Sequence, residues 1–153
     1  MNDRARQVAA ALTISSAAIA GIAFFEGYRA MAYRDVGGIP TIGYGETKGV
    51  KMGDTTTPER ALVRLQESAN EHVKGMVKCI KVPITQGELD AYASFTYNVG
   101  VGAFCSSTLN KKLNSSDYAG ACKELLKWTM AGGKVFPGLI KRRQEEYVRC
   151  IGG

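Results

Sequence analysis

Histidine is nearly absent from this 153-residue sequence, and its four cysteines are widely separated. Zinc sites usually place ligands within a few residues of one another, whereas here the four cysteines lie far apart and His72 is the single histidine. We therefore expect no metal site and no cofactor. Zinc-finger spacing, an RNA-binding aromatic block and a basic heptad region are also missing, so nucleic acid is not an expected partner. The chain has no low-complexity segment and no solenoid repeat, and its length suits one compact domain.

Acidic residues are the scarcer charged class, with 14 against 20 Lys and Arg, which gives a net charge of +6. Residues 110–153 carry nine basic and four acidic side chains, whereas residues 1–109 carry eleven and ten. A basic face of this kind suits an anionic wall polymer or lipid surface. Because no nucleic-acid motif accompanies it, we interpret it as steering toward an acidic cell envelope. A merely solvated basic face would give the same count.

Long hydrophobic runs are also missing, except for one uncharged stretch, Val8–Phe25, which follows Arg4 and Arg6. Its 18 residues reach only the lower limit for crossing a bilayer. Alanine dominates it, with serine, threonine and glycine interspersed. Since leucine and isoleucine supply most of the free energy of insertion, this stretch would insert only marginally.

Three interpretations of this stretch stay open. It can be a signal peptide, cleaved at the small-x-small pattern Ala18-Ile19-Ala20. It can be the first helix of a cytoplasmic protein, with a buried stripe at helical spacing formed by Ile14, Ala18, Ile22 and Phe25. It can also be an uncleaved export segment that stays in the membrane for a time and then leaves it. No cysteine lies in residues 1–78, which excludes control by a disulfide within that part of the chain.

What the sequence does contain is a pair of carboxylates around a tight turn. Glu26 ends the uncharged stretch, Asp35 stands beside Gly37-Gly38, and Thr41 opens a short β-type segment that ends at Gly45. Hydrolysis of a glycosidic bond needs one acid to protonate the leaving oxygen and one carboxylate to stabilise the sugar centre or activate water. The pattern therefore indicates a glycosidase site. The alternative is that Glu26 only caps a helix and Asp35 only starts a turn.

The rest of the chain is predicted to be helical. Thr57-Pro58-Glu59 predicts a helix start, and the helix runs to about Val77 with an apolar face of Leu62, Leu65, Ala69, Val73 and Met76. Thr85 and Glu88 predict a capping box for a helix that ends at Gly100. Further helices are expected around 107–114, 116–130 and 137–150. We expect Trp128 in the core and Val135-Phe136 in a packed loop.

The spacing of Glu26, Asp35 and Thr41, followed by Gly43 and Gly45, resembles the active-site segment of phage-type lysozymes, glycoside hydrolase family 24. Later blocks are similar to the same family and come in the expected order: Val82–Gln86, Phe95–Gly100, Ser107–Leu109, the Trp128 helix, Gly132–Ile140 and Arg142-Arg143. The resemblance covers roughly residues 26–150. It implies a mostly helical α+β lysozyme-like fold, in which a small N-terminal β-hairpin region and a helical C-terminal lobe are joined by a long helix.

The resemblance also implies roles for single residues. Glu26 matches the general acid, Asp35 the second carboxylate, and Thr41 the position that helps hold the attacking water in an enzyme that inverts configuration. Either Arg142 or Arg143 could pair with Glu26 and orient it.

Other implied features are less direct. Tyr97, Asn98 and Thr108 match positions that line the sugar cleft. The implied disulfides are Cys79–Cys105 and Cys122–Cys150. One departure from the family is Glu46, which stands where a histidine often forms a structural ion pair. We expect a changed local contact at Glu46 and no loss of catalysis.

The implied function is that of an endolysin, which lyses the host cell by hydrolysing the β-1,4 bond between N-acetylmuramic acid and N-acetylglucosamine in bacterial peptidoglycan. Two alternatives are a lytic transglycosylase, which uses a single acid and no water, and a non-catalytic envelope-binding module. The presence of Asp35 and Thr41 beside Glu26 argues against both.

The Val8–Phe25 stretch resembles the layout of signal-arrest-release endolysins. In that interpretation residues 1–25 associate transiently with the host inner membrane, through residues 8–25, and then become the first helix of a monomeric periplasmic enzyme. Residues 26–153 would form the lysozyme catalytic domain. Retention in the host cytoplasm until lysis is the alternative location.

Overall fold

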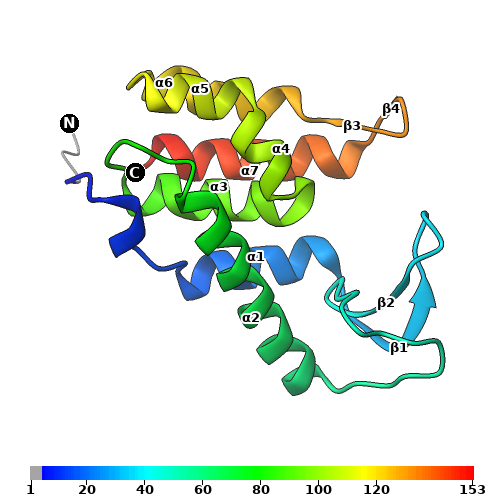
Figure 1. Cartoon of the computed structure of the whole chain (residues 1–153). Helices are drawn as coiled ribbons and strands as arrows, with labels where there is room; N and C mark the ends of the chain where they lie inside the picture. Colours follow the sequence, from blue (N-terminus) through cyan, green and yellow to red (C-terminus); the bar gives the residue numbers. More distant parts are fainter. Residues whose placement is uncertain (1–4) are drawn as a thin grey trace.

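The computed structural model describes residues 5–153, and helices dominate it (Figure 1). In chain order the elements are η1 (Ala9–Ala11), α1 (Ser16–Glu26), β1 (Arg29–Arg34), β2 (Pro40–Gly43), α2 (Pro58–Val77), α3 (Gln86–Val99), α4 (Val101–Ser106), α5 (Thr108–Asn114), α6 (Tyr118–Glu124), η2 (Leu125–Lys127), β3 (Met130–Ala131), β4 (Lys134–Val135) and α7 (Pro137–Ile151). The predicted mostly helical α+β fold, with a hairpin region, a long helix and a helical lobe, is confirmed. Arg4 lies outside the described residues.

The uncharged N-terminal stretch is folded onto the helical lobe. Gln7 exchanges two backbone hydrogen bonds with Ile84, each 2.8 Å long. The Ser15 hydroxyl, which caps α1, donates a 2.6 Å hydrogen bond to the Asp90 carboxylate on α3. Ile22 is fully buried, as the helical spacing predicted. Among residues 5–153 no helix is long and apolar enough to cross a membrane.

Strands β1 and β2 form an antiparallel hairpin, and Asp35 lies in its turn. The Asp35 amide donates to the Ile39 carbonyl, and the Asp35 carbonyl accepts from the Gly38 amide. Gly38 has a φ of +78°, which glycine adopts without steric strain. The β-type segment predicted from Thr41 to Gly45 is present as a strand that begins one residue earlier and ends at Gly43.

Helix α2 joins the hairpin region to the helical lobe (Figure 1). Its predicted start is confirmed, because the Thr57 hydroxyl accepts the Arg60 amide at 3.3 Å and proline occupies the first turn. Leu62, which the sequence placed on the apolar face of this helix, is 46% exposed, and Ala61 is buried instead. The reason is the close approach of β2, since a Cβ on Gly43 would lie 3.0 Å from the Ala61 Cβ.

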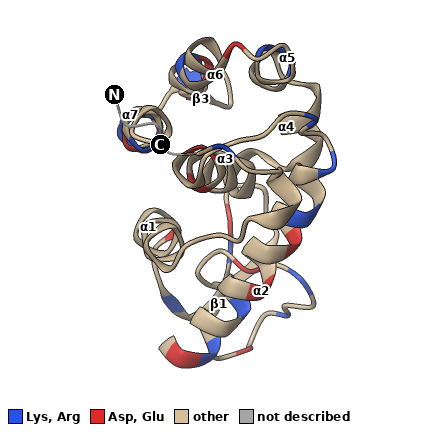
Figure 2. Cartoon of the chain, turned by 90° about the vertical axis from the view of Figure 1, so that its left-hand side faces the viewer, with Lys and Arg blue, Asp and Glu red and all other residues tan. Residues whose placement is uncertain are grey.

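Helix α3 is the centre of the helical lobe and lies against α1, α2 and α7 (Figure 2). Its predicted capping box is present: the Thr85 hydroxyl accepts the Glu88 amide and the Glu88 carboxylate accepts the Thr85 amide. Phe95 is fully buried, and the partly buried Trp128 ring packs on it edge-on with a centroid distance of 5.1 Å. Trp128 therefore belongs to the core, as predicted.

The chain between α6 and α7 differs from the sequence prediction. Instead of a helix to residue 130 and a packed loop, α6 ends at Glu124, and β3 and β4 form a second small hairpin. Its two-residue turn, Gly132-Gly133, has positive φ at both positions, a geometry that glycine pairs favour. Val135 is 57% exposed and is therefore not packed. The short helix α4 was also not predicted.

Two disulfides join the cysteines in the pairs that the family resemblance implied, Cys79 with Cys105 and Cys122 with Cys150. The first links the turn that follows α2 to α4. The second links α6 to the last turns of α7. Both therefore lie in the helical lobe.

Candidate active site

Glu26 is the last residue of α1, and its carboxylate lies where the first helix, the hairpin region and α7 meet. Arg142 on α7 donates a 2.9 Å hydrogen bond from Nη1 to Glu26 Oε1. The Arg142 side chain is 5% exposed, whereas that of Glu26 is 22% exposed. The arrangement thus leaves a carboxylate held from the protein interior and still accessible to a substrate.

Of the two candidate arginines, the structure brings Arg142 to Glu26. Its guanidinium is fixed on all sides: Nη2 donates to the Ser94 carbonyl at 3.0 Å and Nε to Glu146 at 3.2 Å. The guanidinium also lies 5.4 Å from the centre of the Phe25 ring. These contacts restrict the orientation of Arg142 and therefore that of the acid.

Arg143 instead points into the core and is fully buried. It donates to the Asn98 side-chain oxygen, forms an ion pair with Glu146 at 3.2 Å, and stacks over Phe95 at 4.9 Å. Burial lowers the pKa of Arg143 to about 10, so it stays charged at neutral pH. Asn98 is tied to Arg143, and no hydrogen bond joins it to Glu26 within the described residues.

Asp35 organises the tip of the first hairpin, so the turn-forming role considered for it is real. Its Oδ1 accepts the amides of Gly37 at 2.8 Å and Ile39 at 2.9 Å. Thr41, two residues beyond Ile39, is buried and donates from its hydroxyl to the Ile39 carbonyl at 2.9 Å. The hydroxyl oxygen of Thr41 can still accept a hydrogen bond, for example from water. Asp35 and Thr41 are thus part of one small hairpin, and in the described part of the chain neither has a hydrogen bond to Glu26.

Tyr97 connects the helical lobe to the hairpin region. Its hydroxyl donates to the Tyr44 carbonyl at 3.1 Å, one residue before Gly45, which packs against Glu26. The pKa of Tyr97 is raised to about 12, first by burial and then by the negative charge of Glu26. Thr108, in contrast, is exposed at the start of α5, and no contact joins it to the Glu26 site in the described chain.

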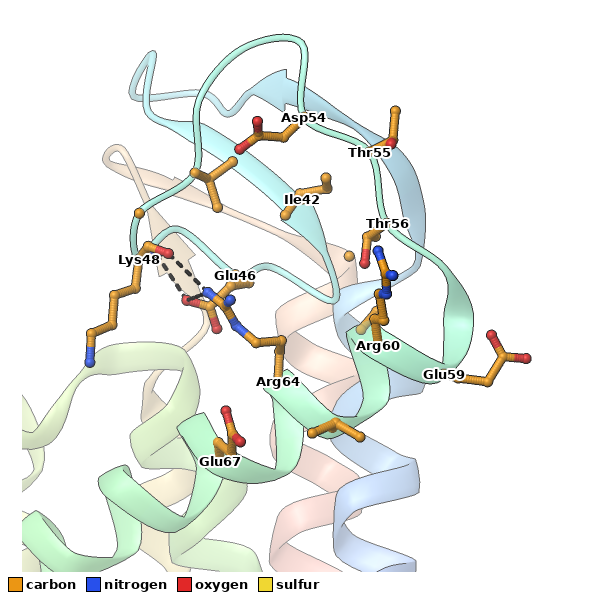
Figure 3. A pocket seen from close by; sticks show the side chains of 15 residues that line it. Ile42, Glu46, Lys48, Asp54, Thr55, Thr56, Glu59, Arg60, Arg64 and Glu67 are labelled. Atoms are coloured by element: carbon orange, nitrogen blue, oxygen red, sulfur yellow. Dashed lines mark hydrogen bonds and ion pairs between the residues drawn. The ribbon is translucent and has the colours of Figure 1, made fainter.

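A hollow of about 570 Å³ lies between β2, the loop after it and α2 (Figure 3). Its lining includes Glu46, but it does not include Glu26, Asp35 or Thr41. Arg64 on α2 also lines the hollow. Its Nη2 lies 3.6 Å from Glu46 Oε1 and donates a 2.9 Å hydrogen bond to the Lys48 carbonyl (Figure 3). The changed contact expected at Glu46 is therefore an ion pair with α2.

Metal ligation has no candidate among the side chains that the structure describes. Within residues 5–153, no three side chains of His, Cys, Asp or Glu come together as ligands would. The site is thus built from a carboxylate, its arginine and a hairpin.

Comparison with known proteins decides the family. The phage lysozyme profile matches residues 23–146, which include Glu26, the hairpin and Arg142. The chain belongs to the phage lysozyme family. Its solved relatives confirm the lysozyme fold: an endolysin from Escherichia coli O157:H7 phage FAHEc1 has a TM-score of 0.82 at 38% identity, covering 92% of this chain and 94% of that one. The muramidase domain of SpmX from Asticaccaulis excentricus has a TM-score of 0.85 at 31% identity, covering 91% and 97%.

Several similar members of the phage lysozyme family are named endolysins. One, from Acyrthosiphon pisum secondary endosymbiont phage 1, is 44% identical over 87% of this chain and 94% of its own length. The endolysin of Bacillus phage B103 is also 44% identical over 93% of this chain, which spans only 55% of that longer protein. A protein named SAR-endolysin, from Bacteriophage PS119, is 40% identical over 84% of this chain and 77% of its own length.

Sequence reasoning missed Glu146 and Ser94. Glu146 is 3% exposed, and its carboxylate contacts both arginines and accepts the Ser94 hydroxyl at 2.7 Å. A signal was available, because Glu146 follows Arg142 by four residues and Arg143 by three, the spacings at which helical side chains meet. Such a pair is usually solvent-exposed, and only the packing of α7 on α3 shows that this one is buried.

Gly45 offers a test of how closely Glu26 must be positioned. It has a φ of +81°, and a Cβ there would lie 3.0 Å from Glu26 Oε2. Gly45→Ala is expected to displace the carboxylate and reduce turnover by about 10–100-fold. Gly49→Ala is the matched control, because Gly49 has a similar φ of +71° and open space around it. Turnover of peptidoglycan by the two variants decides the matter, and equal losses would contradict a positional effect on Glu26.

Proposed function

We propose that the protein is an endolysin that hydrolyses the β-1,4 bond between N-acetylmuramic acid and N-acetylglucosamine in bacterial peptidoglycan, with Glu26 as general acid. The observation that carries the proposal is the partly exposed Glu26 carboxylate held by the buried Arg142. Family membership and relatives named endolysins or muramidase support it. The basic excess of residues 110–153 suits an anionic wall polymer.

In the proposed reaction Glu26 donates its proton to the glycosidic oxygen as the bond to the sugar breaks. Its position at the end of α1 gives it one face toward the protein and one toward substrate. Arg142 fixes the direction of the carboxyl group, which reduces the loss of orientational freedom in the transition state. Because a cation beside a carboxyl group favours its ionised form, this contact must be balanced by other groups.

Asp35 and Thr41 act on the second half of the reaction in this proposal. The Asp35 carboxylate stabilises positive charge on the sugar or activates water, and the Thr41 hydroxyl holds that water. Support comes from the placement of both in one hairpin, with Asp35 fixed by two amides through one of its oxygens. The other oxygen, Oδ2, accepts no hydrogen bond from the described residues. An attack by water on the opposite face of the sugar would invert its configuration.

The products of digestion test this function. Purified peptidoglycan would be incubated with the protein and the soluble fragments identified by mass spectrometry. Reducing muropeptides that end in N-acetylmuramic acid are the expected result. Anhydro-muropeptides would show a lytic transglycosylase instead, and tight binding to the wall without soluble products would show a binding module. The anomeric form of the first product, read by NMR before mutarotation, tests inversion.

We also propose that residues 1–25 hold the protein at the host inner membrane before it is released, folded and active, in the periplasm, with residues 26–153 as the catalytic unit. Relatives named SAR-endolysins support this. So does the attachment of the segment: it is held by backbone bonds to Ile84, by Ser15 on Asp90 and by packing of Ile22, with no disulfide. While the segment lies in the membrane, Glu26 is at the bilayer surface and apart from Arg142.

Three alanines allow the release to be tested without damage to the folded form. Ala10, Ala17 and Ala20 are exposed in the folded protein, so larger side chains fit there. Leucine at all three should favour insertion by about 1–2 kcal/mol and raise the ratio of membrane-bound to released protein about 5–30-fold. Glutamine at the same positions should lower it. The measurement is the share of protein in the membrane pellet after expression, and identical shares for all three proteins would contradict the proposal.

A further inference from the structure

Glu146 is a buried carboxylate that the proposed reaction does not use directly. Its side chain is 3% exposed and lies between two guanidinium groups, with Arg142 Nε and Arg143 Nη1 each at 3.2 Å. The Ser94 hydroxyl completes its surroundings by donating a 2.7 Å hydrogen bond. Buried carboxylates are rare unless they are paired. Here two arginines and a hydroxyl contact one carboxylate, and together they compensate its burial.

Arg142 is shared between Glu146 and the acid. Its Nε faces Glu146 and its Nη1 faces Glu26, so the guanidinium bridges the two carboxylates. The cluster of Arg142, Arg143 and Glu146 carries two positive charges and one negative charge. Without Glu146, two uncompensated cations would lie in the interior behind Glu26, and both would favour its ionised form.

We propose that Glu146 is a positioning residue for the acid: it holds Arg142 on Glu26 and offsets the charge of Arg143 behind it. This inference rests on the proposed function, because it matters only if Glu26 acts as an acid. It assigns a role to a carboxylate that never reaches the substrate.

The other charged groups around the cluster do not supply this compensation. Burial keeps Tyr97 neutral, with a pKa of about 12, so it adds no charge near Glu26. Glu46 is paired with Arg64, and Asp90 is occupied by Ser15 and Gln86. Arg149 and Glu145 line a small cavity near Glu146 and form no ion pair with it in the described chain. Glu146 is thus the carboxylate in contact with both arginines.

The Arg143 end of the cluster is charged at neutral pH. Arg143, with a pKa of about 10, remains a cation. Burial raises the pKa of the Glu146 carboxyl, and Arg143, the Ser94 hydroxyl and Arg142 oppose that rise. The two guanidinium groups, each 3.2 Å from the Glu146 side chain, favour its ionised form, which is the form that the proposal requires.

The pH profile of activity separates this role from a purely structural one. Glu146→Gln keeps the shape of the side chain and its oxygen for Ser94 and Arg142 but removes the charge. The alkaline limb of its pH profile, where the acid loses its proton, should move to lower pH by about 0.5–1 unit. At a fixed pH on that limb, the activity of the variant should therefore be about 3–10-fold lower than that of the wild type. Arg143→Met removes a cation, so its alkaline limb should move to higher pH. Glu145→Gln, the exposed neighbour without an ion pair, should match the wild type.

Opposite shifts of the two variants support the inference, because a general loss of packing lowers activity by the same factor at every pH. Limbs that stay at the wild-type pH in an active protein overturn it and leave the proposed function intact. A wild-type protein that releases no muropeptides overturns both. If Glu146→Gln does not fold, as judged by circular dichroism, the direction of the Arg143→Met shift decides.

Discussion

Glu26→Gln is expected to reduce peptidoglycan hydrolysis by about 10²–10⁴-fold, the usual contribution of a positioned general acid. The substitution keeps the shape of the side chain and an oxygen that can accept the Arg142 Nη1 hydrogen bond. It removes the ionisable group, and with it both the transferable proton and the negative charge of the unprotonated form. Arg142 also keeps its hydrogen bonds to the Ser94 carbonyl and the Glu146 carboxylate. The fold should therefore persist, with a midpoint of thermal unfolding within a few degrees of the wild type.

Release of soluble muropeptides over time measures this effect, and circular dichroism checks the fold. Glu145→Gln is the matched control, since it makes the same chemical change on an exposed carboxylate of α7. Wild-type rates in Glu26→Gln would remove Glu26 from the reaction. A comparable loss in the control would show that the assay responds to charge in general.

Replacing Cys122 and Cys150 by serine is expected to cause a large loss of stability. The disulfide closes a loop between positions 28 apart, and its removal should cost about 3–4 kcal/mol. For a domain of this size that lowers the midpoint of thermal unfolding by about 10 °C. Cys150 belongs to α7, the helix that carries Arg142, so the last turns of that helix should loosen first.

Differential scanning calorimetry of the oxidised proteins gives the measurement. The Cys79→Ser, Cys105→Ser double variant is the control for loop length, because its positions are 26 apart and the chain-entropy effect is nearly equal. Treatment of the wild type with a reductant should reproduce the sum of both losses. An unchanged midpoint after full reduction would contradict the prediction.

Local signals accounted for much of the fold. The Thr57-Pro58 start of α2 and the Thr85–Glu88 capping box depend on neighbouring residues, so the sequence alone predicts them well. The hairpin at Asp35 was likewise predictable from its glycines. The second hairpin was missed although Gly132-Gly133 is a good turn signal, because its strands have only two residues each and leave almost no alternating pattern.

The parts of the site that depend on distant residues could not be predicted in this way. The adjacent Arg142 and Arg143 look alike in the sequence, yet one reaches Glu26 and the other Asn98. Only the way α7 packs on α3 separates them. The burial of Glu146 has the same origin, since a carboxylate three or four residues from an arginine is ordinarily found on a surface.

The contact between Glu26 and Arg142 joins residues 116 positions apart, near opposite ends of the chain. Synthesis from the N-terminus makes the acid long before its arginine, by about 6–25 s at ordinary translation rates. During that interval the nascent chain contains Glu26 and the whole hairpin but no group to orient the acid. In the proposed function, a nascent chain that ends before Arg142 lacks the arginine that orients its acid, so synthesis of α7 sets the earliest moment at which hydrolysis can begin.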